Sequence, residues 1–163
     1  MGQQERSSAV SLRPAEEGDE PFLYRVYAST RAAELALTGW DQEQQEAFLR
    51  QQFGAQQVHY RQHFQGAAFQ VVLCDGVPAG RLYVARGADE IRIVDIALLP
   101  QWRNAGIGTA LLRDLLAEGE GTGKRVSIHV ERFNPALRLY ARLGFRLVQD
   151  KGVYLLLEWT PPS

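Results

Sequence analysis

The chain has 163 residues, 45% hydrophobic and 23% charged, which is typical of a globular domain with room for one core. Lysine and arginine number 18 against 19 aspartate and glutamate, so the net charge of −1 argues against a broad field for nucleic acid or an anionic membrane. The only cysteine, Cys74, excludes an internal disulfide and a thiolate-rich metal cage. We expect one domain over residues 1–163 with no nucleic-acid or membrane partner, and any anion site to be local.

Targeting signals are not evident. No apolar run is long enough to cross a bilayer, and the opening MGQQERSSAV lacks the hydrophobic stretch of a signal peptide. Its Met-Gly start does not fit N-myristoylation, because Arg6 stands where that signal needs serine or threonine. We therefore expect a cytoplasmic protein.

The first part of the chain predicts one strand and two helices. Val10 to Arg13 favour a short strand that Pro14 closes, and apolar spacing over residues 22–37 favours a helix. Asp41 is a natural N-cap for a second, glutamine-rich helix over residues 42–64.

The hydrophobic period then changes from 3.6 to 2. Residues 67–74 and 77–86 flank Asp75-Gly76, a dipeptide that tolerates positive φ and favours a tight hairpin. A second turn over residues 87–90 leads into residues 91–100. The middle of the chain therefore predicts an antiparallel meander.

The last part mixes helices and strands. We expect, in order, a helix over 107–118 ended by Gly119, a strand over 124–130, a helix over 134–144 and two strands over 145–149 and 153–159. The whole pattern is α+β, and one sheet can hold all the strands.

The stretch LLPQWRNAGIGTALL, residues 98–112, brings two glycines to the start of the helix at Ile107. Gly106 and Gly108 carry no Cβ that would hold a phosphate off the first helix amides, and Arg103 adds a cation. We interpret the stretch as a diphosphate site; the alternative is a glycine-rich turn without a ligand.

Two other nucleotide motifs fail at this stretch. A P-loop needs Lys-Ser or Lys-Thr after its last glycine, but Thr109 and Ala110 follow Gly108. The dinucleotide fingerprint would put its third glycine at Leu111. A different carrier of a diphosphate is therefore expected.

RNAGIG (103–108), with the preceding IALLP, resembles the pyrophosphate loop of the GNAT acetyltransferase superfamily. NPALRLYARLGF (134–145) resembles the second motif of that family, and the two occur in the family's order. The resemblance implies a mixed, mostly antiparallel central sheet with helices on both faces and a splayed pair of parallel strands, here residues 91–99 and 125–130.

The resemblance also implies acetyl-CoA as the acyl donor, bound between the two splayed strands. The main chain of Ile96, Ala97 and Leu98 would pair with the pantetheine arm, near a bulge whose amide can polarise the thioester carbonyl. The diphosphate would be held by the amides of Arg103, Asn104, Ala105, Gly106, Ile107, Gly108 and Thr109. Asn134 falls at the family's asparagine, which positions the arm, and Tyr140 falls at the tyrosine that faces the sulfur.

Acetyl transfer needs a neutral amine and a proton for the departing thiolate. Tyr140 is the expected general acid, the alternative being an aromatic residue packed in the core. For the base, His129 corresponds to an acidic residue of some relatives, and Asp95 interrupts an apolar strand. The structural alternative for His129 is a hydrogen-bonded histidine in a strand, and for Asp95 it is a side chain that anchors a loop. Bulk water is the third option for the base.

We expect an N-acetyltransferase that moves the acetyl group to a primary amine of a small molecule or peptide terminus by direct transfer. The alternative function is an acyl-CoA sensor without acceptor chemistry. Members of the family often form dimers, so the resemblance also makes a homodimer one option. His59 and His63 lie four residues apart, but no third ligand is evident, so we expect no metal. The roles of Trp40 and Tyr60 stay open between acceptor pocket and core.

Overall fold

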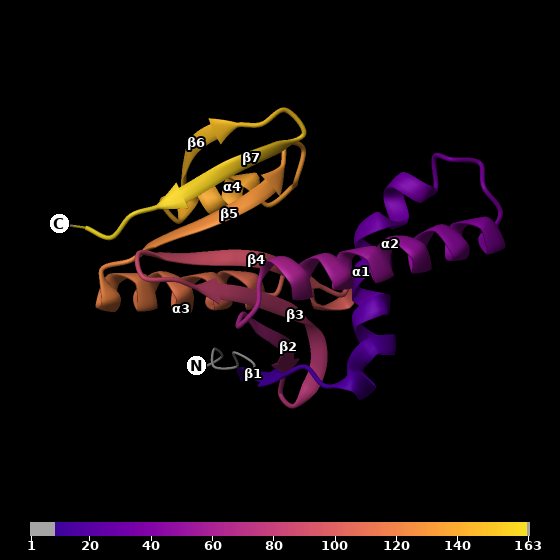
Figure 1. The fold of residues 1–163 in the computed structure, drawn as a ribbon, viewed down its shortest axis with the longest axis horizontal. Helices are drawn as coiled ribbons and strands as arrows, with labels where there is room; N and C mark the ends of the chain where they lie inside the picture. The colour runs from indigo at the N-terminus through magenta and orange to yellow at the C-terminus, as the bar shows by residue number, and fades with distance from the viewer. Residues whose placement is uncertain (1–8, 163) are drawn as a thin grey trace, which may run out of the picture.

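The computed structural model describes residues 9–162, which form seven strands and four α-helices (Figure 1). The Met-Gly start and Arg6 lie outside these residues. The strands are β1 (Val10–Pro14), β2 (Ala68–Cys74), β3 (Val77–Arg86), β4 (Glu90–Leu98), β5 (Arg125–Glu131), β6 (Arg146–Asp150) and β7 (Tyr154–Trp159). The α-helices are α1 (Glu20–Leu35), α2 (Gln42–His63), α3 (Ile107–Thr122) and α4 (Leu137–Arg142), with short 3-10 turns at Glu17–Asp19 and Pro100–Trp102.

All seven described strands form one sheet in the order β1-β2-β3-β4-β5-β7-β6. The β4–β5 pair is parallel, and every other neighbouring pair is antiparallel. The predicted α+β fold, with a mostly antiparallel sheet and one parallel pair, is confirmed.

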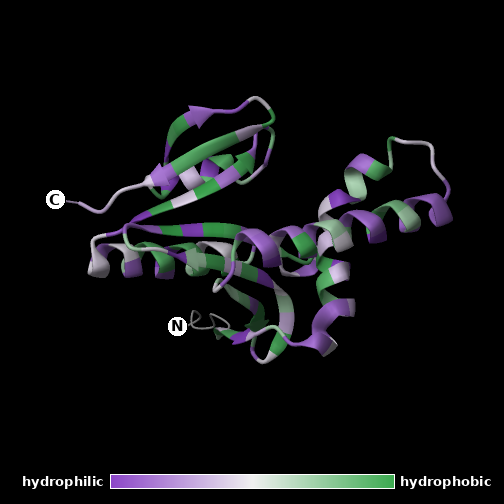
Figure 2. Cartoon of the chain, in the orientation of Figure 1, coloured by the Kyte–Doolittle hydropathy of each residue, from purple (hydrophilic) through white to green (hydrophobic). Residues whose placement is uncertain are grey.

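Helices cover both faces of the sheet. On one face, α1 and α2 enclose a core that includes Tyr27, Phe53 and Val71. On the other face, α3 and α4 pack on the sheet through a larger core that includes Leu111 and Tyr140. Figure 2 shows hydrophilic and hydrophobic residues alternating along β5, as expected for a strand whose two faces meet different surroundings. None of the helices within residues 9–162 is both long and apolar enough to span a bilayer.

Two local signals in the sequence are confirmed. The Asp41 side chain accepts a hydrogen bond from the amide of Gln44, so it caps α2 as predicted. Asp75 and Gly76 have φ angles of 52° and 81°, the positive values that a tight two-residue hairpin between β2 and β3 requires.

The predicted end of α3 at Gly119 is wrong. The helix continues to Thr122 and ends at Gly123, whose φ of 71° is typical of a glycine C-cap. Gly119 serves packing instead, because a Cβ there would lie 2.8 Å from the carbonyl oxygen of Lys124 and 2.9 Å from Trp159 Cζ3. The pattern of glycines could not distinguish a close approach from a helix stop.

α4, the helix of the second motif, is shorter than predicted. It runs from Leu137 to Arg142 rather than over 134–144. The side-chain oxygen of Asn134 accepts a hydrogen bond from the amide of Ala136, so a turn precedes the helix. Gly144, with a φ of 101°, makes the turn into β6.

Gly119→Ala is expected to lower the free energy of unfolding by about 1–2 kcal/mol, because overpacking outweighs the gain in helix propensity. Gly121 lies in the same helix and its Cβ would meet no atom within 4 Å, so Gly121→Ala should raise that free energy by about 0.5–1 kcal/mol. Urea denaturation of the two variants checks this. Equal stabilisation by both would show that Gly119 is not a packing requirement.

Candidate active site

β4 and β5 separate part-way along their length. Their ladder has four pairs, from Glu90 opposite Arg125 to Ile93 opposite Ile128, although β4 continues to Leu98 and β5 to Glu131. Figure 1 shows the two strands diverging towards their C-terminal ends. The backbone groups of β4 that face this opening therefore have no strand partner on that side.

A β-bulge lies at the point of separation. Tyr83 of β3 pairs with Asp95 and the next residue, Val84, pairs with Ile93, so Val94 has no partner. The bulge reverses the alternation of the strand. Ile93 and Ile96 therefore both contact the core under α3, and Asp95 lies on the face of α1 and α2.

The loop before α3 exposes the first amides of that helix. Gly106 is the N-cap, with a φ of 83°, and no side chain caps the helix. A Cβ built on Gly106 or Gly108 would meet no atom within 4 Å, so the space in front of these amides is open. Arg103 ties the loop to β4, because its Nε donates to the carbonyl of Leu98 over 2.9 Å. This geometry fits a diphosphate.

Asp95 is held by two side chains, the buried Arg81 and the half-buried Tyr60. Arg81 Nη2 lies 2.6 Å from Asp95 Oδ2, and the Tyr60 hydroxyl donates to the same oxygen over 2.8 Å. Arg81 is only 2% exposed, and its guanidinium lies 5.9 Å and 5.3 Å from the ring centroids of Tyr27 and Tyr83. No hydrogen bond within residues 9–162 reaches Oδ1 of Asp95, so this oxygen can accept one from a ligand.

Tyr140 reaches the opening from the opposite face of the sheet. It is 3% exposed and packs edge-on against Phe145, with 5.5 Å between ring centroids. Burial, and then the charge of Asp95, raise the pKa of the Tyr140 phenol to about 12. The phenol therefore keeps its proton at neutral pH.

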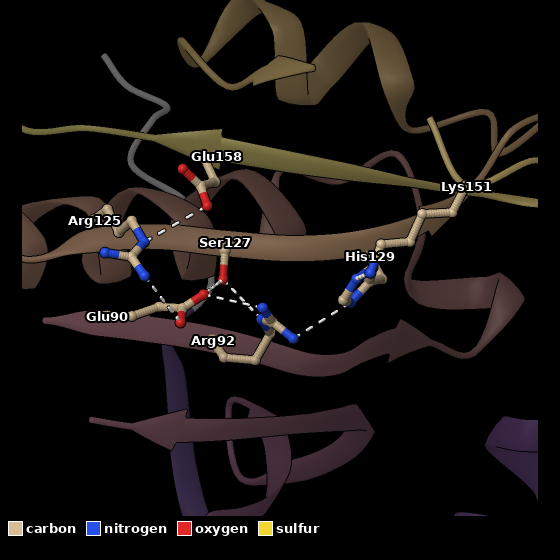
Figure 3. A network of polar contacts seen from close by, with 7 residues as sticks. All are labelled: Glu90, Arg92, Arg125, Ser127, His129, Lys151 and Glu158. Carbon is tan, nitrogen blue, oxygen red and sulfur yellow. Dashed lines mark hydrogen bonds and ion pairs between the residues drawn. The ribbon is translucent and has the colours of Figure 1, made fainter. Parts of the chain in front are cut away.

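His129 lies between two basic side chains, Arg92 and Lys151 (Figure 3). Its neighbours Ile128 and Val130 belong to the core under α3 and α4, so His129 is on the face of α1 and α2. Arg92 Nη1 is 3.3 Å from its Nδ1, and Lys151 Nζ is 3.0 Å from its Nε2. Burial, and then the charges of Arg92 and Lys151, lower the pKa of His129 below 6.5, against an opposing effect of Glu90. The imidazole is therefore neutral at pH 7.

A cleft of about 600 Å³ joins these groups. Of the sequence-predicted site residues, it is lined by Asp95, Ile96, Ala97, His129, Asn134 and Tyr140. Leu98 and residues 103–109 do not line it; they lie beyond it, at the end of β4 and the start of α3. The structure thus brings the three predicted catalytic residues into one cleft and leaves the predicted diphosphate loop at a separate place.

Sequence reasoning missed four arginine and lysine residues of this cleft, Arg31, Arg81, Arg92 and Lys151. It also did not locate the bulge. The spacing of isoleucine and leucine at 91, 93, 96 and 98 could have located it. The step from 93 to 96 is three residues in a pattern that otherwise repeats every two, which is typical of a bulged strand.

The remaining candidates from the sequence are His59, His63, Cys74, Trp40 and Tyr60. His59 and His63 stack at 4.2 Å between ring centroids, and no group of three or more His, Cys, Asp or Glu within residues 9–162 could hold a metal. Cys74 is 1% exposed at the end of β2. Trp40 packs on Phe48 away from the cleft, whereas Tyr60 lines it.

Comparison with solved structures finds the same fold in N-acetyltransferases. The PaiA N-acetyltransferase of Thermoplasma acidophilum, solved in complex with coenzyme A, superposes with a TM-score of 0.70 at 18% identity, over 93% of this chain and 99% of that chain. An acetyltransferase from Thermus thermophilus gives 0.69 at 21% identity, over 94% and 98% of the two chains.

Among curated proteins, mouse cysteine-rich protein 2-binding protein is 38% identical over 58 residues, which are 36% of this chain and only 7% of the mouse protein. A sequence model described as the acetyltransferase (GNAT) family matches residues 24–145, most of the chain. The chain therefore belongs to the GNAT family of acetyltransferases.

Proposed function

We propose that the protein is an N-acetyltransferase that moves the acetyl group of acetyl-CoA directly to a primary amine of a small molecule or peptide terminus. The observation that carries the proposal is the cleft at the separation of β4 and β5, which is lined from both faces of the sheet. Tyr140 approaches it from the face of α3 and α4, and Asp95 from the face of α1 and α2. Donor and acceptor can therefore meet there without a covalent enzyme intermediate.

The donor side rests on main-chain groups. The uncapped amides of Ile107, Gly108 and Thr109 suit the diphosphate of coenzyme A, and the unpartnered edge of β4 beyond Val94 suits its extended pantetheine arm. Coenzyme A bound to the PaiA enzyme supports this choice of donor. Acetyl-CoA supplies a thioester whose carbonyl carbon a neutral amine can attack.

Tyr140 is the proposed general acid. Because its pKa is raised to about 12, the phenol is protonated at pH 7 and can give its proton to the leaving thiolate. The thiolate's conjugate acid has a pKa of roughly 8.5 by analogy with cysteine, so this transfer is uphill. The edge-on contact with Phe145 holds the ring in one orientation.

Asp95 is the proposed first acceptor of the amine's proton. Arg81 and Tyr60 fix the carboxylate through Oδ2, which leaves Oδ1 free to bind the incoming ammonium and pass its proton to water. His129 is the less favoured base, because forming an imidazolium between Arg92 and Lys151 costs additional electrostatic energy.

Asp95→Asn is expected to lower kcat/KM by about 10-fold or more at pH 7 and by much less above pH 9, where more of the amine is neutral without help. The ratio of rates at the two pH values is measured within one variant, so partial unfolding from the unpaired Arg81 largely cancels. His129→Gln is the comparison variant and should show no such pH dependence. A loss that is equal at both pH values for Asp95→Asn would assign Asp95 to structure alone.

Direct transfer is tested by initial rates with both substrates varied. A ternary complex gives double-reciprocal lines that intersect, whereas a covalent acetyl-enzyme gives parallel lines. Cys74 is buried and outside the cleft, and it offers no nucleophile for the second route. Parallel lines would contradict the proposal.

A further inference from the structure

Lys151, His129 and Arg92 bring an excess of N–H donors to one end of the cleft (Figure 3). A neutral imidazole has one nitrogen that accepts a hydrogen bond and one that carries a hydrogen. Arg92 faces Nδ1 and Lys151 faces Nε2, both of them donors. Whichever tautomer forms, one imidazole N–H points at a basic group, and this arrangement lacks an acceptor.

The charges around His129 are also unbalanced. The connected network contains three cations, Arg92, Arg125 and Lys151, against two carboxylates, Glu90 and Glu158. Glu90 is shared between Arg92 at 3.0 Å and Arg125 at 3.5 Å, and it also accepts from the Ser127 hydroxyl. Within residues 9–162, no carboxylate lies within 4.0 Å of the Lys151 ammonium.

Lys151 is placed on a turn whose backbone is fixed. Its amide donates to the carbonyl of Tyr154, and Arg132 of the segment after β5 donates to the carbonyl of Gly152 and pairs with Asp150. The ammonium is thus presented to the cleft by a hydrogen-bonded turn between β6 and β7. Less conformational entropy is lost when such a group binds a ligand.

The position of this cluster points to the acceptor rather than to coenzyme A. Arg92 and His129 project on the face of α1 and α2, as does Asp95, whereas the diphosphate loop leads into α3 on the opposite face. None of residues 103–109 lines the cleft. A ligand oxyanion at Lys151 would therefore belong to the molecule that carries the amine.

We propose that Lys151, His129 and Arg92 form a subsite for an oxyanion of the acceptor, a carboxylate or a phosphate, so that the acceptor is an amine with an anionic group. The imidazole N–H and the ammonium donate to the oxyanion while Asp95 Oδ1 receives the amine. This inference rests on the proposed function for its acceptor, but the subsite binds anions whether or not transfer occurs.

The first test observes the subsite without turnover. Sodium acetate or inorganic phosphate is titrated into the protein while the imidazole NMR signals are followed, with His129 assigned by the signal lost in His129→Gln. We expect a saturable shift and a raised pKa of His129 in the wild type, and a shift at least about 5-fold weaker in Lys151→Met. Lys124→Met is the matched control, because Lys124 is the only other lysine and lies outside the cleft.

The second test compares matched acceptors. Amino acids and their carboxamides, and aminoalkyl phosphates and the corresponding amino alcohols, are assayed with acetyl-CoA. We expect kcat/KM to favour the anionic amines by about 5- to 20-fold in the wild type and in Lys124→Met, and this preference to vanish in Lys151→Met. The preferred anion identifies carboxylate or phosphate.

The outcomes separate the two proposals. No saturable shift of His129, an equal shift in Lys151→Met, or an equal preference in that variant would overturn the subsite. A fall in acetyl-CoA affinity of Lys151→Met as large as the fall in anion preference would assign the oxyanion to the coenzyme and also overturn it. A saturable shift without acetylation of any amine would leave the subsite standing and refute the proposed function.

Discussion

Tyr140→Phe is expected to lower kcat by about 100-fold or more, which is the usual scale of a general acid. The substitution removes one oxygen and keeps the ring that packs on Phe145, so the fold and the affinity for acetyl-CoA should change little. Steady-state rates and calorimetry of acetyl-CoA binding measure the two effects separately. Only the fall in kcat, which reports lost stabilisation of the transition state, should be large.

Tyr24→Phe is the matched control for this loss. Tyr24 is another buried tyrosine, it packs on Phe53 and it does not line the cleft. Its kcat should stay within about 2-fold of the wild type, as for most substitutions away from a reaction centre. Equal losses of binding and turnover in Tyr140→Phe would make Tyr140 a structural residue, and an unchanged rate would remove it from the mechanism.

Gly108→Val is expected to weaken acetyl-CoA binding by about 100-fold or more, because a branched side chain would occupy the open space in front of the first amides of α3. Gly108 lies within α3 and is not among the glycines with a positive φ, so the variant should fold. Gly106 is less suitable, because its φ of 83° would add backbone strain to any effect on the ligand.

Gly121→Val controls for the low helix propensity of valine. Gly121 lies in the same helix and its Cβ would also meet no atom within 4 Å, but it is near the C-terminal end. Its acetyl-CoA affinity should equal that of the wild type. Unchanged affinity in Gly108→Val, measured by calorimetry, would refute the diphosphate site at this loop.

Features that depend on a few neighbouring residues were predictable from the sequence. Asp41 capping α2 and the hairpin at Asp75-Gly76 follow from side-chain and backbone preferences that act within four residues. Asn134 and Tyr140 of the second motif line the cleft, as do Asp95 and His129 of the two strands, whereas residues 103–109 of the first motif do not.

Features that depend on distant contacts were not predictable. The sequence around Gly119 predicts a helix end, because it does not show that Lys124 and Trp159 pack closely against this glycine. Arg81 lies 14 residues before Asp95, and only the antiparallel pairing of β3 and β4 brings their side chains together. The contact of Lys151 with His129 likewise requires the β6–β7 turn to lie over the end of β5.

The most direct measurement is the product balance of the purified protein with acetyl-CoA and a panel of primary amines. Free coenzyme A thiol and acetylated amine are quantified together by mass spectrometry. We predict equimolar amounts of the two products, formed only when an amine is present and strongly reduced in Tyr140→Phe. Tight binding of acetyl-CoA without amine-dependent release of thiol for any amine of the panel would contradict this and leave a protein that senses acyl-CoA.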